Sequence, residues 1–445
     1  MRNRFEFLGG VLLAAVLVAG ASIVSVPAYA QDDSQPQKRQ TRQVQAASKP
    51  VYDKLTEAQE ALDNKDDAGA LKIMQELETK ANKLSSYERV LVYQLEGYIY
   101  ANNEKYDQAI IYFQKMLKEK DIPPQLHDTI LYTMGQLYLA TEQYQKSVDT
   151  LKDWFKTAEN PGPQAYIALA NGYVMLDNYK AAREPAETAL QKGKDNFARM
   201  TEAHKADPEN NPEPQPIQES WYQLLLSIDS QLKDFKAARV LLGEMLDRFP
   251  KRDYWIYLAG ISSELGKDMD QLGAMEAAYR QNLLERSNEY ENLAQLYMYN
   301  NIPIKGAWVM EKAMKAKKAD DTAKNWELLA NAYYNAQEME KSISPLTKAA
   351  QLSDDGELYV RLGQSYMDLA KWDDAAKAFQ AAIKKGKLKN EGEASLFLGM
   401  SYFNGGDFND ARTAFRTARD HNETKQSATQ WLNYLQAEEK RHALQ

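Results

Sequence analysis

A segment of 21 residues recurs in similar form along the chain, and this repetition limits the possible folds more than any other feature. Residues 362–382 read LGQSYMDLAKWDDAAKAFQAA, and residues 398–418 read LGMSYFNGGDFNDARTAFRTA. Similar segments begin at Met134 and Leu169. In each, a small residue is followed three places on by tyrosine, and then by small and bulky apolar residues at helical spacing. This pattern predicts two amphipathic helices joined by a tight turn.

These residues are the signature of the tetratricopeptide repeat, and the chain resembles that family from about Val51 to about residue 425. Nine of ten repeats carry glycine or alanine at the small position of the first helix, and Leu225 is the exception. The positions are Ala58, Gly97, Gly135, Ala170, Leu225, Ala259, Ala294, Ala330, Gly363 and Gly399. The resemblance implies an all-α fold, a right-handed superhelical solenoid of about ten helix-turn-helix repeats.

The spacing of the repeats predicts how the array is divided. Counted from seven residues before each small position, the repeats start at residues 51, 90, 128, 163, 218, 252, 287, 323, 356 and 392. All intervals lie between 33 and 39 residues except one of 55, which holds four prolines between residues 208 and 216. We therefore expect a four-repeat array over 51–192, a Pro-rich insertion over 193–217, a six-repeat array over 218–425, and a capping helix and tail over 426–445.

The N-terminus has the pattern of an export signal. Arg2 and Arg4 precede an apolar stretch from Val11 to Val26, and small residues at Ala28 and Ala30 complete an A-x-A site. We predict a cleaved signal peptide over 1–30 and a disordered, Gln-rich leader over 31–49; an uncleaved membrane anchor is the alternative.

The composition adds to this prediction. Residues 1–30 carry two basic residues and one acidic residue, so their removal lowers the formal net charge from −8 to −9. An acidic chain without a basic tract disfavours binding to nucleic acid or to anionic lipid. There is no cysteine, which excludes disulfides and thiolate chemistry.

The sequence contains no motif that indicates a catalytic site. The four histidines are scattered without metal-ligand spacing, and no phosphate-binding loop or serine nucleophile motif is present. Asp373 and Asp374 resemble a paired general acid and base, but they fall where a helix starts, and acidic residues favour that position. We expect no enzyme, no cofactor and no metal site. An enzyme would need a catalytic set in the insertion, which offers His204 and acidic residues.

A solenoid of this kind binds partners along the groove lined by its first helices. In this family the second, fifth, ninth and twelfth positions of each repeat line that groove. They give a candidate protein-binding surface, aromatic and apolar with an acidic rim, and the alternative for each residue is packing against the next repeat. The predicted residues are Tyr132, Ile167, Tyr222, Ile256, Glu291, Glu327, Tyr334, Glu357, Met367, Glu393 and Phe403.

Export combined with a repeat scaffold predicts a periplasmic adaptor in a Gram-negative cell. The signal, the leader, the opening segment VYDKLTEAQEAL and the ten repeats resemble tetratricopeptide proteins encoded beside TonB, ExbB and ExbD. That resemblance implies a role in TonB-dependent uptake across the outer membrane, with TonB or another periplasmic or inner-membrane protein as partner. A scaffold for outer-membrane assembly or polysaccharide export is the alternative.

Overall fold

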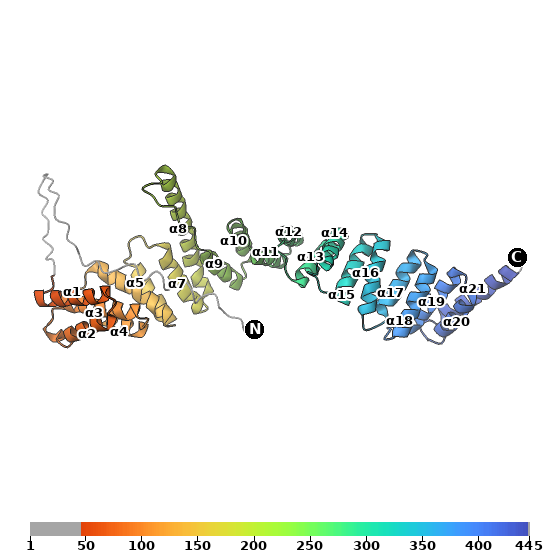
Figure 1. Ribbon diagram of the computed structural model, residues 1–445, viewed down its shortest axis with the longest axis horizontal. Coiled ribbons are helices and arrows are strands. Elements are labelled where there is room, and N and C mark those ends of the chain that lie inside the picture. Colours follow the sequence, from red (N-terminus) through yellow and green to blue (C-terminus); the bar gives the residue numbers. More distant parts are fainter. Residues whose placement is uncertain (1–45, 444–445) are drawn as a thin grey trace. The chain divides into compact units, whose positions relative to one another are not determined.

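The computed structural model describes residues 46–443, which form 21 α-helices (Figure 1). The odd-numbered helices up to α19 are the first helices of the ten repeats: α1 (Lys49–Asp63), α3 (Ser86–Asn102), α5 (Pro124–Ala140), α7 (Pro163–Met175), α9 (Glu219–Gln231), α11 (Arg252–Glu264), α13 (Ser287–Tyr299), α15 (Ala323–Asn335), α17 (Glu357–Asp368) and α19 (Glu391–Gly405).

The even-numbered helices are the second helices: α2 (Asp67–Glu78), α4 (Tyr106–Leu117), α6 (Tyr144–Phe155), α8 (Tyr179–Ala206), α10 (Phe235–Arg248), α12 (Asp268–Arg280), α14 (Pro303–Lys315), α16 (Met339–Leu352), α18 (Trp372–Lys385) and α20 (Phe408–Arg419). The last helix is α21 (Lys425–Ala443). The all-α prediction of ten helix pairs followed by a capping helix is confirmed.

The contacts between residues divide the chain into two compact lobes, an N-terminal lobe that ends at Asp234 and a C-terminal lobe that begins at Phe235. The division falls within the fifth repeat, between α9 and α10. Within each lobe, helices that follow one another in sequence pack side by side (Figure 1). The expected division of the array at the Pro-rich insertion stays a prediction.

The small position brings the two helices of a repeat into close contact. A Cβ atom on Gly363 would lie 2.6 Å from the ring of Phe379, which is fully buried on the second helix of the same repeat. Gly399 and Phe415 have the same relationship at 2.5 Å. The glycines are therefore required because the aromatic ring occupies the space of a side chain.

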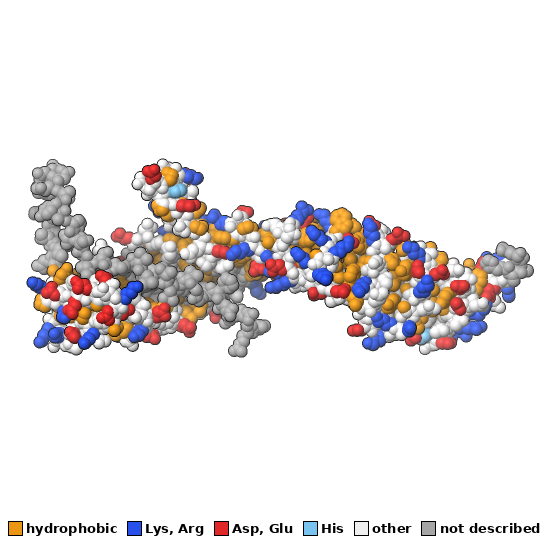
Figure 2. Space-filling view, viewed as in Figure 1, with side chains coloured by type: hydrophobic (Ala, Val, Ile, Leu, Met, Phe, Trp, Pro, Cys, Tyr) orange, Lys and Arg blue, Asp and Glu red, His pale blue; other side chains and the backbone are white. Residues whose placement is uncertain are grey.

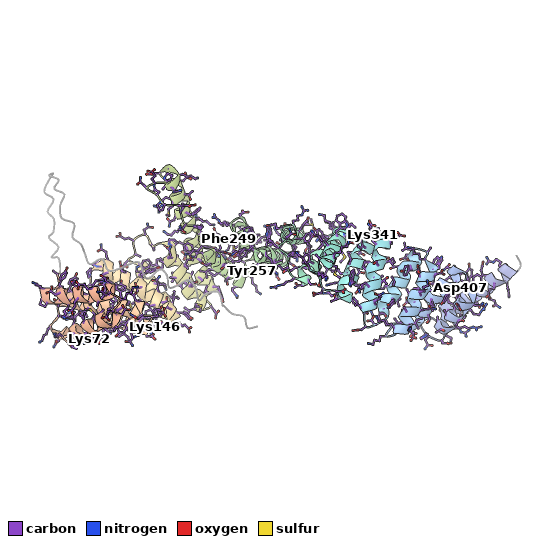
Figure 3. The ribbon with its side chains drawn as sticks, viewed as in Figure 1. Lys72, Lys146, Phe249, Tyr257, Lys341 and Asp407 are labelled. Carbon is purple, nitrogen blue, oxygen red and sulfur yellow. The ribbon has the colours of Figure 1, made fainter. Side chains whose placement is uncertain are left out.

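Each turn between the paired helices contains one residue with left-handed backbone. These residues have φ between 53° and 88° and are Lys65, Glu104, Glu142, Asp177, Lys233, Gly266, Asn301, Gln337, Ala370 and Gly406. The next residue then donates its N–H to the carbonyl five residues back; Asp407, labelled in Figure 3, donates to Tyr402 at 2.8 Å. This bond ends the first helix in a Schellman arrangement.

Three prolines lie within second helices of the repeats. Pro303 is the first residue of α14, where the missing N–H has no partner to lose. Pro185 and Pro345 lie inside α8 and α16. The helix α8 runs 28 residues, from Tyr179 to Ala206, so it includes the first part of the segment 193–217, and it extends beyond α7 in Figure 1.

The capping helix α21 covers the last repeat. Trp431 stacks on the buried ring of Phe415 with 5.5 Å between the centroids, and Leu435 is also buried in this cluster. The apolar end of the array is thereby covered, as a solenoid requires. The predicted signal peptide and most of the predicted leader lie outside the described residues, and α1 begins at Lys49.

Candidate functional site

The predicted groove residues lie on first helices, and their exposure differs widely. Tyr334 is 41% exposed and Glu393 is also exposed. The partly buried members are Tyr132, Ile167, Ile256, Glu291, Glu327, Glu357, Met367 and Phe403. Their binding of a partner stays a prediction.

Aromatic and apolar members of the set serve packing. Tyr222 is completely buried, so its prediction as a surface residue is corrected: its ring fills the core instead of facing a partner. Tyr132 packs against Trp154 with 4.8 Å between ring centroids. Phe403 packs against Trp431 and Tyr434 of α21, because the capping helix covers the end of the groove there.

Acidic residues of the predicted groove form ion pairs with neighbouring repeats. Glu291 Oε2 lies 2.8 Å from Lys324 Nζ, and Ser287 donates its hydroxyl to Glu291 Oε1 at 2.8 Å. Burial raises the pKa of Glu291, but the hydrogen bonds from Lys324 and Ser287 outweigh it and lower the pKa below its ordinary value. Glu291 is therefore ionised and paired.

A similar ion pair joins the next two repeats. Arg361 on α17 donates to both Glu327 and Asn331 on α15. Glu357 accepts the backbone N–H of Lys389. The carboxylates predicted as an acidic rim thus already have donors at these positions: Glu291 and Glu327 from the following repeat, and Glu357 from the segment that follows α18. Figure 2 shows basic and acidic side chains interspersed over the visible face of the C-terminal lobe.

One pocket opens among three helices of the C-terminal lobe. It has a volume of about 200 Å³ and is enclosed by α15, α16 and α17. Its lining combines three groove-type side chains, Asn331, Tyr334 and Gln364, with Ala330, Ser342, Leu346, Arg361, Ser365 and Asp368. We call it the α15–α17 pocket. Of the predicted residues, it contains Tyr334.

The α15–α17 pocket has charged groups of two kinds. Its guanidinium, Arg361, is engaged by Glu327 and Asn331. Its carboxylate, Asp368, is exposed and has no hydrogen bond or ion pair with another residue of 46–443. Gln364 likewise has no side-chain hydrogen bond within that range. The pocket therefore offers one unpaired carboxylate and one unpaired amide.

One buried acidic residue, Glu96, is a feature that the sequence pattern did not predict. Glu96 on α3 is completely buried, and neither carboxylate oxygen has a hydrogen-bond partner within the described chain. Burial, with a further contribution from Glu78, raises the pKa of Glu96 to about 8 although Lys115 opposes the change. Its carboxyl group is therefore mostly protonated at neutral pH. A glutamate among apolar residues in α3 was the available signal.

His204, the histidine near the Pro-rich loop, has a structural role. His204 Nδ1 lies 2.7 Å from the carbonyl of Asn211, which can only accept, so His204 donates there and ties the Pro-rich loop to α8. Within residues 46–443 no three acidic or histidine side chains are grouped to hold a metal ion. No helix in that range is long and apolar enough to cross a membrane.

Two segments of the chain match family models. Residues 360–429 and residues 90–120 each match a model described as tetratricopeptide repeat. The first covers α17 to α20 and the second covers α3 and α4, so both coincide with helix pairs of the structure. No curated protein matches the sequence.

The following solved structures are similar to parts of the chain and distant from it in sequence. YrrB, described as a TPR protein with an unusual peptide-binding site, is 15% identical with a TM-score of 0.34, over 42% of this chain and 96% of YrrB. A tetratricopeptide repeat protein from Parabacteroides merdae is 15% identical with a TM-score of 0.33, over 72% of this chain and 100% of its own. The TPR2AB domain of yeast Sti1 in complex with a pHSP90 is 14% identical with a TM-score of 0.33, over 63% and 98%.

The family matches and the helix pairs agree in register. The matched segments lie near the two ends of the array. The pairs between them repeat the same turn and, apart from Leu225, the same small position. Repeats of the kind that these two segments match form protein-binding scaffolds. Residues 90–120 and 360–429 are therefore similar in sequence to tetratricopeptide repeats.

Proposed function

We propose that the first-helix face of the C-terminal lobe holds an extended segment of a partner protein at the α15–α17 pocket. The observation that carries this proposal is the set of unpaired groups in the pocket: the Gln364 amide, the exposed Tyr334 ring and the Asp368 carboxylate. An extended peptide presents unpaired backbone N–H and C=O groups, which a primary amide can both accept from and donate to.

The cellular role we propose is that of a periplasmic accessory to TonB-dependent energy transduction. Its support is the signal-peptide pattern of residues 1–30 and the resemblance of the whole chain to tetratricopeptide proteins encoded with TonB systems. TonB-type periplasmic linkers are rich in lysine and proline, and such segments are extended and expose their backbone.

The variants for testing this proposal must leave the ion pairs between repeats intact. Glu291 and Glu327 join neighbouring repeats, so changing them would disturb the scaffold as well as any surface. Tyr334→Ala combined with Gln364→Ala alters the pocket and leaves those pairs in place. Trp308→Ala is the matched control, since Trp308 is 56% exposed on α14, a second helix, and does not line the pocket.

The test is capture of the periplasmic part of TonB by the predicted mature chain, residues 31–445. We expect capture by the wild-type chain and by Trp308→Ala, and a loss of roughly tenfold or more in affinity for the double variant. Equal capture by all three chains would remove the pocket from the proposal. Absence of capture by the wild-type chain would remove TonB as the partner.

A further inference from the structure

We propose that the α15–α17 pocket receives a lysine side chain of the bound segment, with its ammonium group at Asp368. This inference rests on the proposed function and adds the chemical identity of the side chain that the pocket selects. Asp368 is the last residue of α17, and its carboxylate is exposed at the pocket. It has no partner within residues 46–443, so a bound cation would displace water and no existing contact.

The charge of the pocket favours a cation over an anion. The one cationic side chain of the lining, Arg361, already donates to Glu327 and to Asn331. An anionic ligand would have to break those bonds, whereas a cation finds Asp368 unpaired. The lining therefore has an unsatisfied negative charge and a satisfied positive charge.

The walls suit the apolar stem of a lysine. Ala330 and Leu346 contribute apolar surface, and both are almost completely buried under the pocket. Tyr334 contributes an aromatic ring that is 41% exposed, and an ammonium group is attracted to the face of such a ring. Lysine combines a long apolar stem with a compact charged end, so it satisfies both kinds of surface.

The size of the pocket indicates one side chain. Its volume of about 200 Å³ lies below the roughly 300–1,000 Å³ of pockets that enclose small-molecule ligands. A side chain that enters from a segment lying along the groove needs only part of such a volume.

The combination of an aromatic ring and a carboxylate occurs at this point alone among the neighbouring repeats of the C-terminal lobe. In the preceding pair of repeats, the positions of Tyr334 and Asp368 hold Met298 and Asn335. In the following pair they hold Met367 and Asn404. A lysine-bearing segment would therefore be favoured in this register over the two adjacent ones, because neither neighbouring pair of repeats has the aromatic ring and the carboxylate.

The inference is tested with a fluorescently labelled, capped peptide of alternating lysine and proline, and with a matched peptide in which glutamine replaces lysine. Binding to the predicted mature chain is measured by fluorescence anisotropy at about 0.15 M salt, where unspecific attraction between distant charges is screened. The variants are Asp368→Asn and Tyr334→Ala. Asp354→Asn is the control, since it removes the same charge at an exposed residue outside the pocket.

We expect Asp368→Asn to weaken the lysine peptide roughly tenfold and Asp354→Asn to change its affinity by less than about twofold. The glutamine peptide should bind the wild-type chain no more tightly than the lysine peptide binds Asp368→Asn. Circular dichroism at rising temperature shows whether each variant is folded.

Three results would overturn the inference: equal losses for Asp368→Asn and Asp354→Asn, equal affinity for the two peptides, or no binding of the lysine peptide. If both peptides bind equally and Tyr334→Ala weakens both, the lysine assignment fails while the proposed groove function stands. If neither Tyr334→Ala nor Asp368→Asn changes the affinity for either peptide, then the lysine assignment and the proposed binding of a partner at this pocket both fail. The TonB assignment depends on the capture experiment alone.

Discussion

Glu291 on α13 and Lys324 on α15 form an ion pair that joins the first helices of two successive repeats, with 2.8 Å between Glu291 Oε2 and Lys324 Nζ. The Glu291 side chain is only 13% exposed, whereas that of Lys324 is 72% exposed. The carboxylate is thus fixed by its surroundings and the lysine lies over it from the solvent side. Part of the groove surface therefore serves the cohesion of the array.

Reversing one charge of this pair should destabilise the C-terminal lobe. Glu291→Lys places two ammonium groups together and leaves the Ser287 hydroxyl without its acceptor, so we expect a loss of about 1–2 kcal/mol in the free energy of unfolding. Adding Lys324→Glu should restore part of the loss. Urea unfolding of both single variants and the double variant measures the coupling. A double variant whose loss equals the sum of the two single losses would show that the pair does not interact.

Filling the small position should also destabilise the repeat. Gly363→Ala places a methyl group 2.6 Å from the Phe379 ring, so we expect a loss of about 1–3 kcal/mol. Gly273→Ala is the matched control, because Gly273 lies on α12 with no atom within 4 Å of an added Cβ. There alanine should be neutral or stabilise by up to about 1 kcal/mol. Equal urea midpoints for the two variants would contradict the close-packing account.

The buried Glu96 predicts a pH dependence of stability in the N-terminal lobe. Its pKa is about 8 in the folded chain and near 4.5 when unfolded, so the folded state binds more protons between these values. Stability should therefore fall as the pH rises from 4.5 through 8, by at most about 1.4 kcal/mol per pH unit from this group. Below pH 4.5 the group is protonated in both states and adds no slope.

The variant Glu96→Gln isolates this contribution. It should lose the fall in stability above pH 4.5 and exceed the wild-type chain in stability near pH 9, because no charge then has to be buried. Glu60→Gln, at an exposed glutamate of α1, should keep the wild-type pH profile. Urea unfolding at several pH values measures the difference, and parallel profiles for the wild-type chain and Glu96→Gln would refute the assignment.

The capping helix should contribute measurably to stability through Trp431. The Trp431 ring contacts Phe415 and Phe403 with centroid distances of 5.5 Å and 5.6 Å. Because the indole is only partly buried, Trp431→Ala should cost about 2 kcal/mol, below the 3–5 kcal/mol typical of fully buried aromatic residues. Tyr299→Ala, at a tyrosine that is 71% exposed, should change stability by less than about 0.5 kcal/mol. Thermal unfolding compares the two.

The helix pairs could be predicted because their packing code is local in sequence. Gly363 and Phe379 lie sixteen residues apart in one repeat, and the same spacing relates Gly97 to Phe113 and Gly399 to Phe415. A small residue facing a ring is required by sterics wherever two helices approach this closely. The sequence therefore contained the register of all ten repeats.

The left-handed turn position could not be predicted from residue type. Glu104, Gln337 and Ala370 adopt positive φ although such residues disfavour it, at a cost of about 1 kcal/mol each. The carbonyls at the end of the first helix and the packing of the second helix impose that backbone. Only Gly266, Gly406 and Asn301 are residues typical of such a turn.

The candidate site was predicted in part. The helix positions identified Tyr334 in the pocket. They did not indicate that Glu291 and Glu327 pair with Lys324 and Arg361 of the following repeat. Reading each acidic residue together with the basic residues of the next repeat would have indicated the pairs. Asp368 was not found, since an acidic residue at a helix end carries no signal without its surroundings.

The most direct measurement of the central claim is site-specific photocrosslinking in intact cells. A photoreactive phenylalanine analogue is placed at Met367, one turn from Gln364 on α17, or at Trp308 on α14, and the crosslinked peptides are identified by mass spectrometry. We predict one partner crosslinked at Met367 through an extended, lysine-bearing segment, and no such adduct at Trp308. Adducts at Trp308 without any at Met367 would contradict the proposal.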